Sequence, residues 1–325
     1  MNSFHFPIIS FNFSEFSGRL KSERCARNKR LGGLENVFLY SNQMIIDSEC
    51  NTVYFSEKLK SNFPEEFNRI VEALAPYNYI TIKLLKATKD EWARDYMPIQ
   101  TAAKRLIKFR YQPSYEPRAN WTEPKKVIKA NRLRTHFSEH NINLDGGNVV
   151  KWKDKVIISD RVIIENHTYE NSPDLLIDRI SEDLQTQVIV IKAHEEKADM
   201  TGHADGMLRF VNENTLIGNR LSDELKPIRD SIEQMLEKYD FNYIDLPFFE
   251  DKTNNHYSAI GTYVNFLEIA DVILFPIFGH PKQKNEEALE IMMSTFPDRK
   301  IIPIDIDEVG KDGGLMNCIS WCLKE

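Results

Sequence analysis

The feature that most constrains the fold of this chain is a unit of one helix, one strand and a polar loop that occurs five times. Within each unit, apolar residues recur at helical spacing, and a short β-prone run follows. The units comprise residues 64–87, 124–147, 172–193, 223–248 and 285–306. Hairpin-like strand pairs are predicted between units, at residues 149–160, 208–219 and 263–278. The five sequences are dissimilar, so the repetition is one of elements.

Five units of similar size predict an α/β architecture that repeats and closes on itself. Strands that alternate with helices of this length also fit a doubly wound α/β sheet, which is the alternative. We expect Ser222 and Asn285 to cap the helices of the last two units. Because no linker interrupts the chain, a single domain over residues 1–325 is expected.

Composition excludes several classes of protein. A hydrophobic content of 42% and a charged content of 28% are typical of a globular protein with a substantial core. The net charge of −7 disfavours a nucleic-acid or anionic-membrane partner and favours a cationic ligand. No apolar run approaches the roughly 20 residues that span a bilayer, and the N-terminus is a poor signal peptide. We therefore expect a cytoplasmic location. A homo-oligomer is compatible with the sequence.

The four cysteines, at positions 25, 50, 318 and 322, do not form a disulfide framework in a chain of this length. The C-x3-C spacing of Cys318 and Cys322 has no matching Cys/His cluster, so no structural zinc site is expected.

Chemically active side chains gather in the loops that follow the strands. Asp95, Asp145, His203, Asp205 and Cys318 all lie in such loops, each near a glycine or a proline. Loops mounted on rigid strands are common positions for catalytic groups. Taken singly, each motif has a structural explanation, such as a glycine turn or a buried cysteine. Because equivalent positions of a closed repeat point toward one axis, the five side chains are predicted to meet.

The residue types indicate a reaction on a planar cation. Three carboxylates attract a cation and can accept several hydrogen bonds from a forked donor. A cysteine is a nucleophile when it is held as the thiolate, which a cationic neighbour favours. Since the carboxylates oppose the thiolate until a cation arrives, the substrate itself is expected to assist activation. The target is then the electrophilic carbon of a guanidinium.

An ordered set of motifs supports this interpretation. The motifs are WARDYMP (92–98), LDGGN (144–148), GHADGMLRF (202–210), YVNF (263–266) and GGLMNCIS (313–320). In order and separation they resemble the agmatine deiminase and bacterial-type peptidylarginine deiminase family, within the guanidino-group-modifying superfamily. They span about seventy per cent of the chain. The resemblance implies the pentein fold, a five-bladed α/β propeller with pseudo-fivefold symmetry.

The resemblance also implies roles. Cys318 matches the family nucleophile and His203 the general acid/base. Asp95 and Asp205 match the pair that grips the guanidinium nitrogens, and Asn265 matches a site-lining asparagine. No metal or organic cofactor is implied.

Three of the motifs depart from the family pattern. Asp145 stands where agmatine deiminases typically have glutamate, so it either contacts the substrate amine or supports His203. Tyr96 and Met97 replace a small residue and a glycine, and Asn317 replaces a histidine. The first forty-odd residues also lack the usual Trp-rich opening. These changes touch substrate choice more than chemistry.

The expected reaction is hydrolysis of agmatine to N-carbamoylputrescine and ammonia through a thiouronium on the cysteine, a step of polyamine metabolism. The far amine of agmatine needs an acidic or aromatic partner, for which Asp145, Trp92 and Tyr96 are candidates. If the substrate were free arginine, Arg94 and Arg209 would be the candidates to form an ion pair with its carboxylate. Alternatives are a peptidylarginine deiminase, an amidinotransferase, a metallohydrolase and a non-catalytic guanidinium-binding module. The metallohydrolase would use His203, Asp205, Asp95 and Asp145 as ligands.

Overall fold

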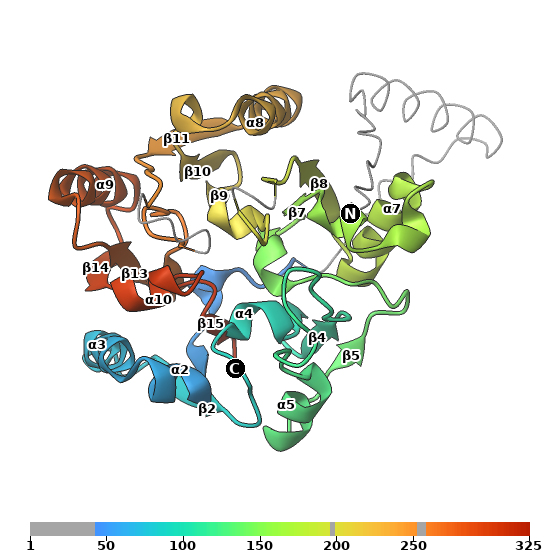
Figure 1. Cartoon of the computed structure of the whole chain (residues 1–325), viewed down its shortest axis with the longest axis horizontal. Helices are drawn as coiled ribbons and strands as arrows, with labels where there is room; N and C mark the ends of the chain where they lie inside the picture. The colour runs from blue at the N-terminus through green and yellow to red at the C-terminus, as the bar shows by residue number, and fades with distance from the viewer. Residues whose placement is uncertain (1–42, 196–198, 252–257) are drawn as a thin grey trace, which may run out of the picture. The chain divides into compact units, whose positions relative to one another are not determined.

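Five three-stranded sheets make up the part of the chain that this computed structural model describes, residues 43–195, 199–251 and 258–325 (Figure 1). The strands are β1 Thr52–Ser56, β2 Thr81–Leu85, β3 Ile99–Ala102, β4 Arg105–Lys108, β5 His136–Phe137, β6 Val150–Lys151, β7 Lys155–Ser159, β8 Gln187–Ile191, β9 Leu208–Asn212, β10 Thr215–Asn219, β11 Asn242–Leu246, β12 Leu267–Ile269, β13 Val272–Ile277, β14 Lys300–Asp305 and β15 Ser320–Leu323. The sheets are β15-β1-β2, β3-β4-β5, β6-β7-β8, β9-β10-β11 and β12-β13-β14.

Every sheet has the same internal pattern. The central strand pairs antiparallel with the strand on one side and parallel with the strand on the other. A parallel pair needs a crossover, and helices supply it. The α-helices are α2 Glu57–Asn62, α3 Pro64–Leu74, α4 Ala93–Tyr96, α5 Pro124–Ala130, α6 Arg161–Ile164, α7 Pro173–Leu184, α8 Lys226–Tyr239, α9 Lys282–Thr295 and α10 Asp307–Lys311. The predicted repetition of helix and strand is therefore confirmed.

The longer helices α3, α7, α8 and α9 lie outside their sheets, which face the middle of the picture (Figure 1). Each helix buries one apolar stripe against its own sheet. On α8, for example, Ile228, Ile232 and Met235 are buried, and they pack with Leu216 of β10. This spacing of apolar residues is the signal that made the units visible in the sequence. None of the described helices is both long and apolar enough to cross a membrane.

Two predicted helix caps are wrong. Helix α8 begins at Lys226 with Leu225 before it, because Pro227 occupies the first turn, where proline is well tolerated; Ser222 lies in a 3-10 turn instead. Asn285 lies within α9 rather than before it. Its buried amide accepts from the Tyr263 hydroxyl at 2.7 Å and donates to a backbone carbonyl.

The predicted strand of the second unit is also displaced. Residues 142–144 form only a single bridge, between Asn143 and Arg110, while the regular strand β5 is His136–Phe137. The predicted single domain includes residues 1–42, which lie outside the described residues together with Cys25 and the Trp-poor opening.

The first sheet is completed by the far end of the chain. Strand β15 pairs antiparallel with β1, so that Tyr54 lies opposite Trp321. The indole of Trp321 is buried, packs on the Tyr54 ring at a centroid distance of 5.0 Å, and donates to the carbonyl of Pro98 at 2.7 Å. This pairing explains the apolar content of the last residues and holds the turn before β15 in place.

We predict that Trp321→Ala lowers the free energy of unfolding by about 3–5 kcal/mol, because it removes a buried aromatic ring and leaves a cavity. Equilibrium denaturation measures the change. Met293→Ala on the exposed face of α9 is the control and should stay within about 0.5 kcal/mol of the parent. A loss below about 1 kcal/mol for Trp321→Ala would show that β15 does not hold the first sheet together.

Candidate active site

The predicted site residues lie in equivalent places of the five sheets. Each occupies the short turn that leads into the first strand of a sheet: Asp95 before β3, Asp145 before β6, His203 and Asp205 before β9, Asn265 before β12 and Cys318 before β15. All but Cys318 are buried, with exposed fractions of 8% or less, and Cys318 is partly exposed. Residues distant in sequence are therefore brought into one cluster by the repeat.

The imidazole of His203 lies between two carboxylates. Its Nε2 is 3.2 Å from Oδ2 of Asp145, and its Nδ1 is 3.6 Å from Oδ1 of Asp95. The same Asp95 oxygen accepts from the backbone N–H of Gly147 at 3.0 Å. Asp145 therefore supports His203, which is one of the two roles that the sequence left open for it.

The thiol of Cys318 lies against Asn265 and Asp205. Its Sγ is 3.4 Å from Oδ1 of Asn265 and 4.0 Å from Oδ2 of Asp205. The same Asn265 oxygen accepts from the backbone N–H of Cys318 at 3.3 Å and of Asn317 at 3.0 Å. Asn265 thus fixes the turn that presents the cysteine.

The electrostatics of the cluster favour a protonated histidine. Burial alone would lower the pKa of His203, but the carboxylates of Asp95, Asp145 and Asp205 raise it to about 10. Burial also raises the pKa of Asp95. The charge of His203 lowers this pKa, and the negative charges of Asp145 and Asp205 raise it further. The cluster holds more carboxylates than cations, so an incoming cation would be stabilised.

The thiol of Cys318 is held protonated in the free protein. Burial raises its pKa well above the ordinary value, and the negative charges of Asp205 and Asp95 raise it further. A cation bound between these carboxylates would offset both charges. The expected activation of the cysteine by its own substrate agrees with this arrangement.

Three side chains of the cluster lie tightly against Gly147. A Cβ atom at this position would lie 2.6 Å from Oδ1 of Asp95, 2.6 Å from Nδ1 of His203 and 3.4 Å from Oδ2 of Asp205. The two shortest distances are too short for a Cβ atom, so only glycine fits at this position. The carboxylates of Asp95 and Asp205 therefore lie close together at Gly147, and they offer the acceptors that a planar, multi-donor cation requires.

Two aromatic candidates for contact with the substrate tail have different positions. Trp92 is partly exposed and packs on Gly314, where an added Cβ would meet both the Trp92 ring at 2.4 Å and Cβ of Cys318 at 3.1 Å. Trp92 is therefore beside the thiol. Tyr96 is 2% exposed and packs in a core cluster with Tyr111. The prediction of Tyr96 as a partner of the substrate amine is wrong, because its ring points into the core.

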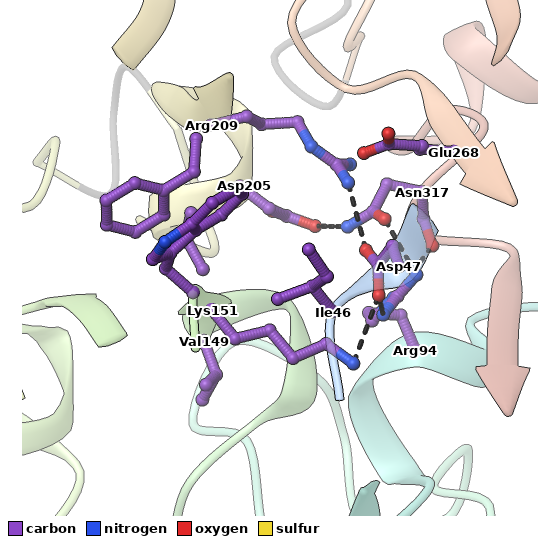
Figure 2. A pocket seen from close by; sticks show the side chains of 12 residues that line it. Ile46, Asp47, Arg94, Val149, Lys151, Asp205, Arg209, Glu268 and Asn317 are labelled. Atoms are coloured by element: carbon purple, nitrogen blue, oxygen red, sulfur yellow. Dashed lines mark hydrogen bonds and ion pairs between the residues drawn. The ribbon is translucent and has the colours of Figure 1, made fainter. Parts of the chain in front are cut away.

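Arg94 and Arg209 are both already paired with the carboxylate of Asp47 (Figure 2). The carboxylate of Asp47 is 2.9 Å from Nη2 of Arg209, 3.1 Å from Nζ of Lys151 and 3.8 Å from Nη1 of Arg94. Arg209 also donates to the carbonyl of Phe266 at 2.7 Å. Neither arginine is therefore available to form an ion pair with a substrate carboxylate.

Two residues of the site were missed by the sequence analysis. Tyr115 donates its hydroxyl to Oδ2 of Asp145 at 2.8 Å, and its ring meets His203 edge to face at 5.9 Å. It lies in a loop without any motif, so no signal pointed to it. Asn317 donates to Oδ2 of Asp205 at 2.6 Å. Its place beside Cys318 was a signal, but it was noted only as a departure.

The cluster does not have the geometry of a metal site. Among the residues that the structure describes, no group of three or more His, Cys, Asp or Glu side chains is arranged to hold an ion. Both nitrogens of His203 face carboxylates, so neither is directed at an open coordination position.

Comparison with solved structures defines the fold as the pentein fold, a five-bladed α/β propeller. An agmatine deiminase variant of C. jejuni with substrate bound superposes with a TM-score of 0.72 at 15% identity, covering 87% of this chain and 96% of that one. The agmatine deiminase of Enterococcus faecalis gives a TM-score of 0.70 at 16% identity, with 87% and 96% covered. At these identities the likeness concerns the fold alone.

A family model for the Porphyromonas-type peptidyl-arginine deiminase matches residues 23–323. The chain therefore belongs to this family. A curated relative, “Putative agmatine deiminase 2” of Listeria monocytogenes, is 37% identical over 65 residues. That match covers 20% of this chain and only 17% of the relative.

We predict that the imidazole of His203 titrates near pH 10 in an NMR titration, far above the ordinary 6.5. Asp145→Asn removes one of the negative charges, so the midpoint should fall by at least about one pH unit. Because the folded pKa is raised, the ion pairs of His203 stabilise the fold fully below pH 6.5, and this contribution is lost as the pH rises toward 10.

Asp230→Asn on α8, where the carboxylate pairs with Lys226, is the control for that titration and should leave His203 unchanged. An imidazole midpoint near 6.5 in the parent protein, or one that Asp145→Asn does not move, would contradict the arrangement of charges described above.

Proposed function

We propose that this protein is a cysteine-dependent hydrolase that deiminates the guanidino group of a small cationic compound, with agmatine as substrate. The observation that carries the proposal is the convergence of Asp95, His203 and Asp205 at Gly147, with the Cys318 thiol 4.0 Å from Oδ2 of Asp205. A guanidinium is planar, keeps its charge and donates in a fixed fork, which suits carboxylates on several sides. Family membership supports the same class of reaction.

The residues divide the reaction between them. Asp95 and Asp205 hold the guanidinium, whose positive charge favours ionisation of Cys318, so the thiol releases its proton to solvent and becomes the thiolate. The thiolate attacks the central carbon and forms a C–S bond. Protonated His203 gives its proton to the departing nitrogen, so the C–N bond breaks, ammonia leaves and a thiouronium remains on the sulfur.

The second half of the reaction is hydrolysis. Neutral His203 removes a proton from water, which attacks the thiouronium carbon. The C–S bond then breaks, the hydroxyl proton of the intermediate passes to the departing sulfur, and the ureido product leaves. The Cys318 thiol and the His203 imidazolium are thereby regenerated, and the ammonia takes up the proton that was released on binding. Asp145 and Tyr115 keep the imidazole in place through both halves. Oδ2 of Asp145 faces Nε2 of His203, and the Tyr115 hydroxyl donates to the same oxygen.

A small dication fits the surroundings better than an arginine does. Free arginine would bring a carboxylate near buried acidic groups, and both Arg94 and Arg209 are engaged by Asp47. Trp92 beside the thiol supplies an aromatic face for the far amine of agmatine, which a cation–π contact would stabilise. The name of the family, by contrast, favours peptidyl arginine.

We expect Cys318→Ala to abolish ammonia release while guanidino compounds still bind, because only the nucleophile is removed. Cys322→Ala is a matched control: Cys322 is a free, buried cysteine four positions along the chain and should be dispensable for turnover. Iodoacetamide should label Cys318 before Cys50 and Cys322, since it is the most exposed cysteine of the described part of the chain. Substantial turnover by Cys318→Ala would end the covalent mechanism.

Asp95→Asn and Asp205→Asn should each lower kcat/KM by about one to two decades. Each change weakens a charge-assisted hydrogen bond to a buried cation, worth about 1.5–3 kcal/mol. Steady-state ammonia release measures the loss, with Asp230→Asn again as the surface control. If both variants stay within about twofold of the parent, the two carboxylates do not hold the guanidinium.

A comparison of specificity constants for agmatine, free arginine, methylated arginines and a blocked arginine peptide tests the choice of substrate. We expect agmatine to lead by at least about tenfold, which corresponds to about 1.4 kcal/mol. Ammonia release without an added amine acceptor distinguishes hydrolysis from amidino transfer. A blocked peptide that exceeds agmatine by about tenfold would show that the site admits polypeptides.

A further inference from the structure

Asn317 connects the candidate active site to a neighbouring charged cluster, which consists of Asp47, Arg94, Lys151 and Arg209. Its side-chain Nδ2 donates to Oδ2 of Asp205 at 2.6 Å, and its Oδ1 accepts from Nη2 of Arg94 at 2.7 Å (Figure 2). Its backbone carbonyl accepts from Nε of Arg94 at 3.3 Å, and its backbone N–H donates to Oδ1 of Asn265 at 3.0 Å. Asn317 is 4% exposed, so all of these bonds are shielded from water.

Arg94 determines which way this amide faces. A guanidinium only donates hydrogen bonds, so the carbonyl end of the amide must face Arg94 and the NH2 end must face Asp205. Rotating the amide end for end would bring donors together on one side and acceptors together on the other. Arg94 is itself held by Asp47, whose carboxylate also binds Lys151 and Arg209.

We propose that Asn317 is a positioning residue whose amide, oriented by Arg94, fixes the Asp205 carboxylate as an acceptor for the guanidinium. The inference rests on the proposed function, because it takes Asp205 as a guanidinium ligand. One residue then sets two parts of the site. Its side chain holds Asp205, and its backbone, bonded to Asn265, holds the turn that presents Cys318.

A purely structural role makes a different prediction. If Asn317 served only to anchor Arg94, an acceptor at this position would suffice. Asn317→Asp keeps that acceptor and strengthens the pair with Arg94, but it loses the donor toward Asp205 and places a second carboxylate beside it. The structural role therefore predicts that Asn317→Asp binds substrate normally, and the positioning role predicts that it does not.

The experiment measures guanidinium binding as protection of Cys318 from iodoacetamide by agmatine and, separately, by a blocked arginine peptide. Thermal unfolding of each variant establishes that it is folded. We expect Asn317→Asp to raise the half-protecting concentration at least about tenfold, as expected for a lost hydrogen bond to a charged group. Asn285→Asp is the matched control. Asn285 is also buried and bonded on both sides of its amide, but it lies in α9, and its variant should stay within about twofold.

Asn317→Ala decides the question if the Asp variant does not fold, because it removes the donor without adding charge. A folded variant, Asp or Ala, that is protected within about twofold of the parent would overturn the inference. Failure of the proposed function has a different signature: protection in the parent protein without ammonia release contradicts the hydrolase but not the role of Asn317. Absence of protection in the parent by either compound would contradict both.

Discussion

The candidate site depends on one buried imidazolium enclosed by carboxylates. His203 lies within 3.6 Å of both Asp95 and Asp145, and Asp205 completes the group around Gly147. Burying even one carboxylate costs free energy unless its charge is paired. The protonated histidine offsets part of the negative charge of the three carboxylates, and a bound cation would offset the rest. The same balance keeps the Cys318 thiol protonated when no cation is bound. In the proposed reaction, binding of the cation and activation of the nucleophile are therefore one electrostatic event.

A second buried cluster, next to the first, has an excess of positive charge. There a carboxylate, Asp47, is surrounded by three cations, Arg94, Lys151 and Arg209, and its pKa is strongly lowered even though burial acts against it. Asn317 is the contact between the two clusters (Figure 2). The repeat makes this possible, because each of the five turns reaches the middle from a different sheet. Groups placed next to rigid strands are held more precisely than groups on long loops.

Sequence reasoning identified the elements and side chains that carry a local signal. The helical spacing in residues 226–239 and the glycines beside Asp145 and Asp205 were sufficient to find α8 and two of the site turns. What it missed depends on contacts between distant residues. The β1–β15 pairing joins opposite ends of the described chain, and Tyr115 reaches Asp145 from a loop without a pattern. Asn285 resembles a helix cap by type, but burial gave its amide other partners. The alternation of helix and strand alone also fitted a doubly wound sheet, which five separate three-stranded sheets exclude for the described residues.

The central claim is that the guanidino carbon becomes bonded to the sulfur of Cys318, and rapid acid quenching followed by peptide mapping tests it most directly. The protein is mixed with excess agmatine, quenched at successive times and analysed by mass spectrometry. The account predicts a transient species in which the peptide containing Cys318 gains the mass of agmatine less that of ammonia. If ammonia accumulates beyond the amount of protein while Cys318 stays unmodified at every quench time, the covalent account is contradicted.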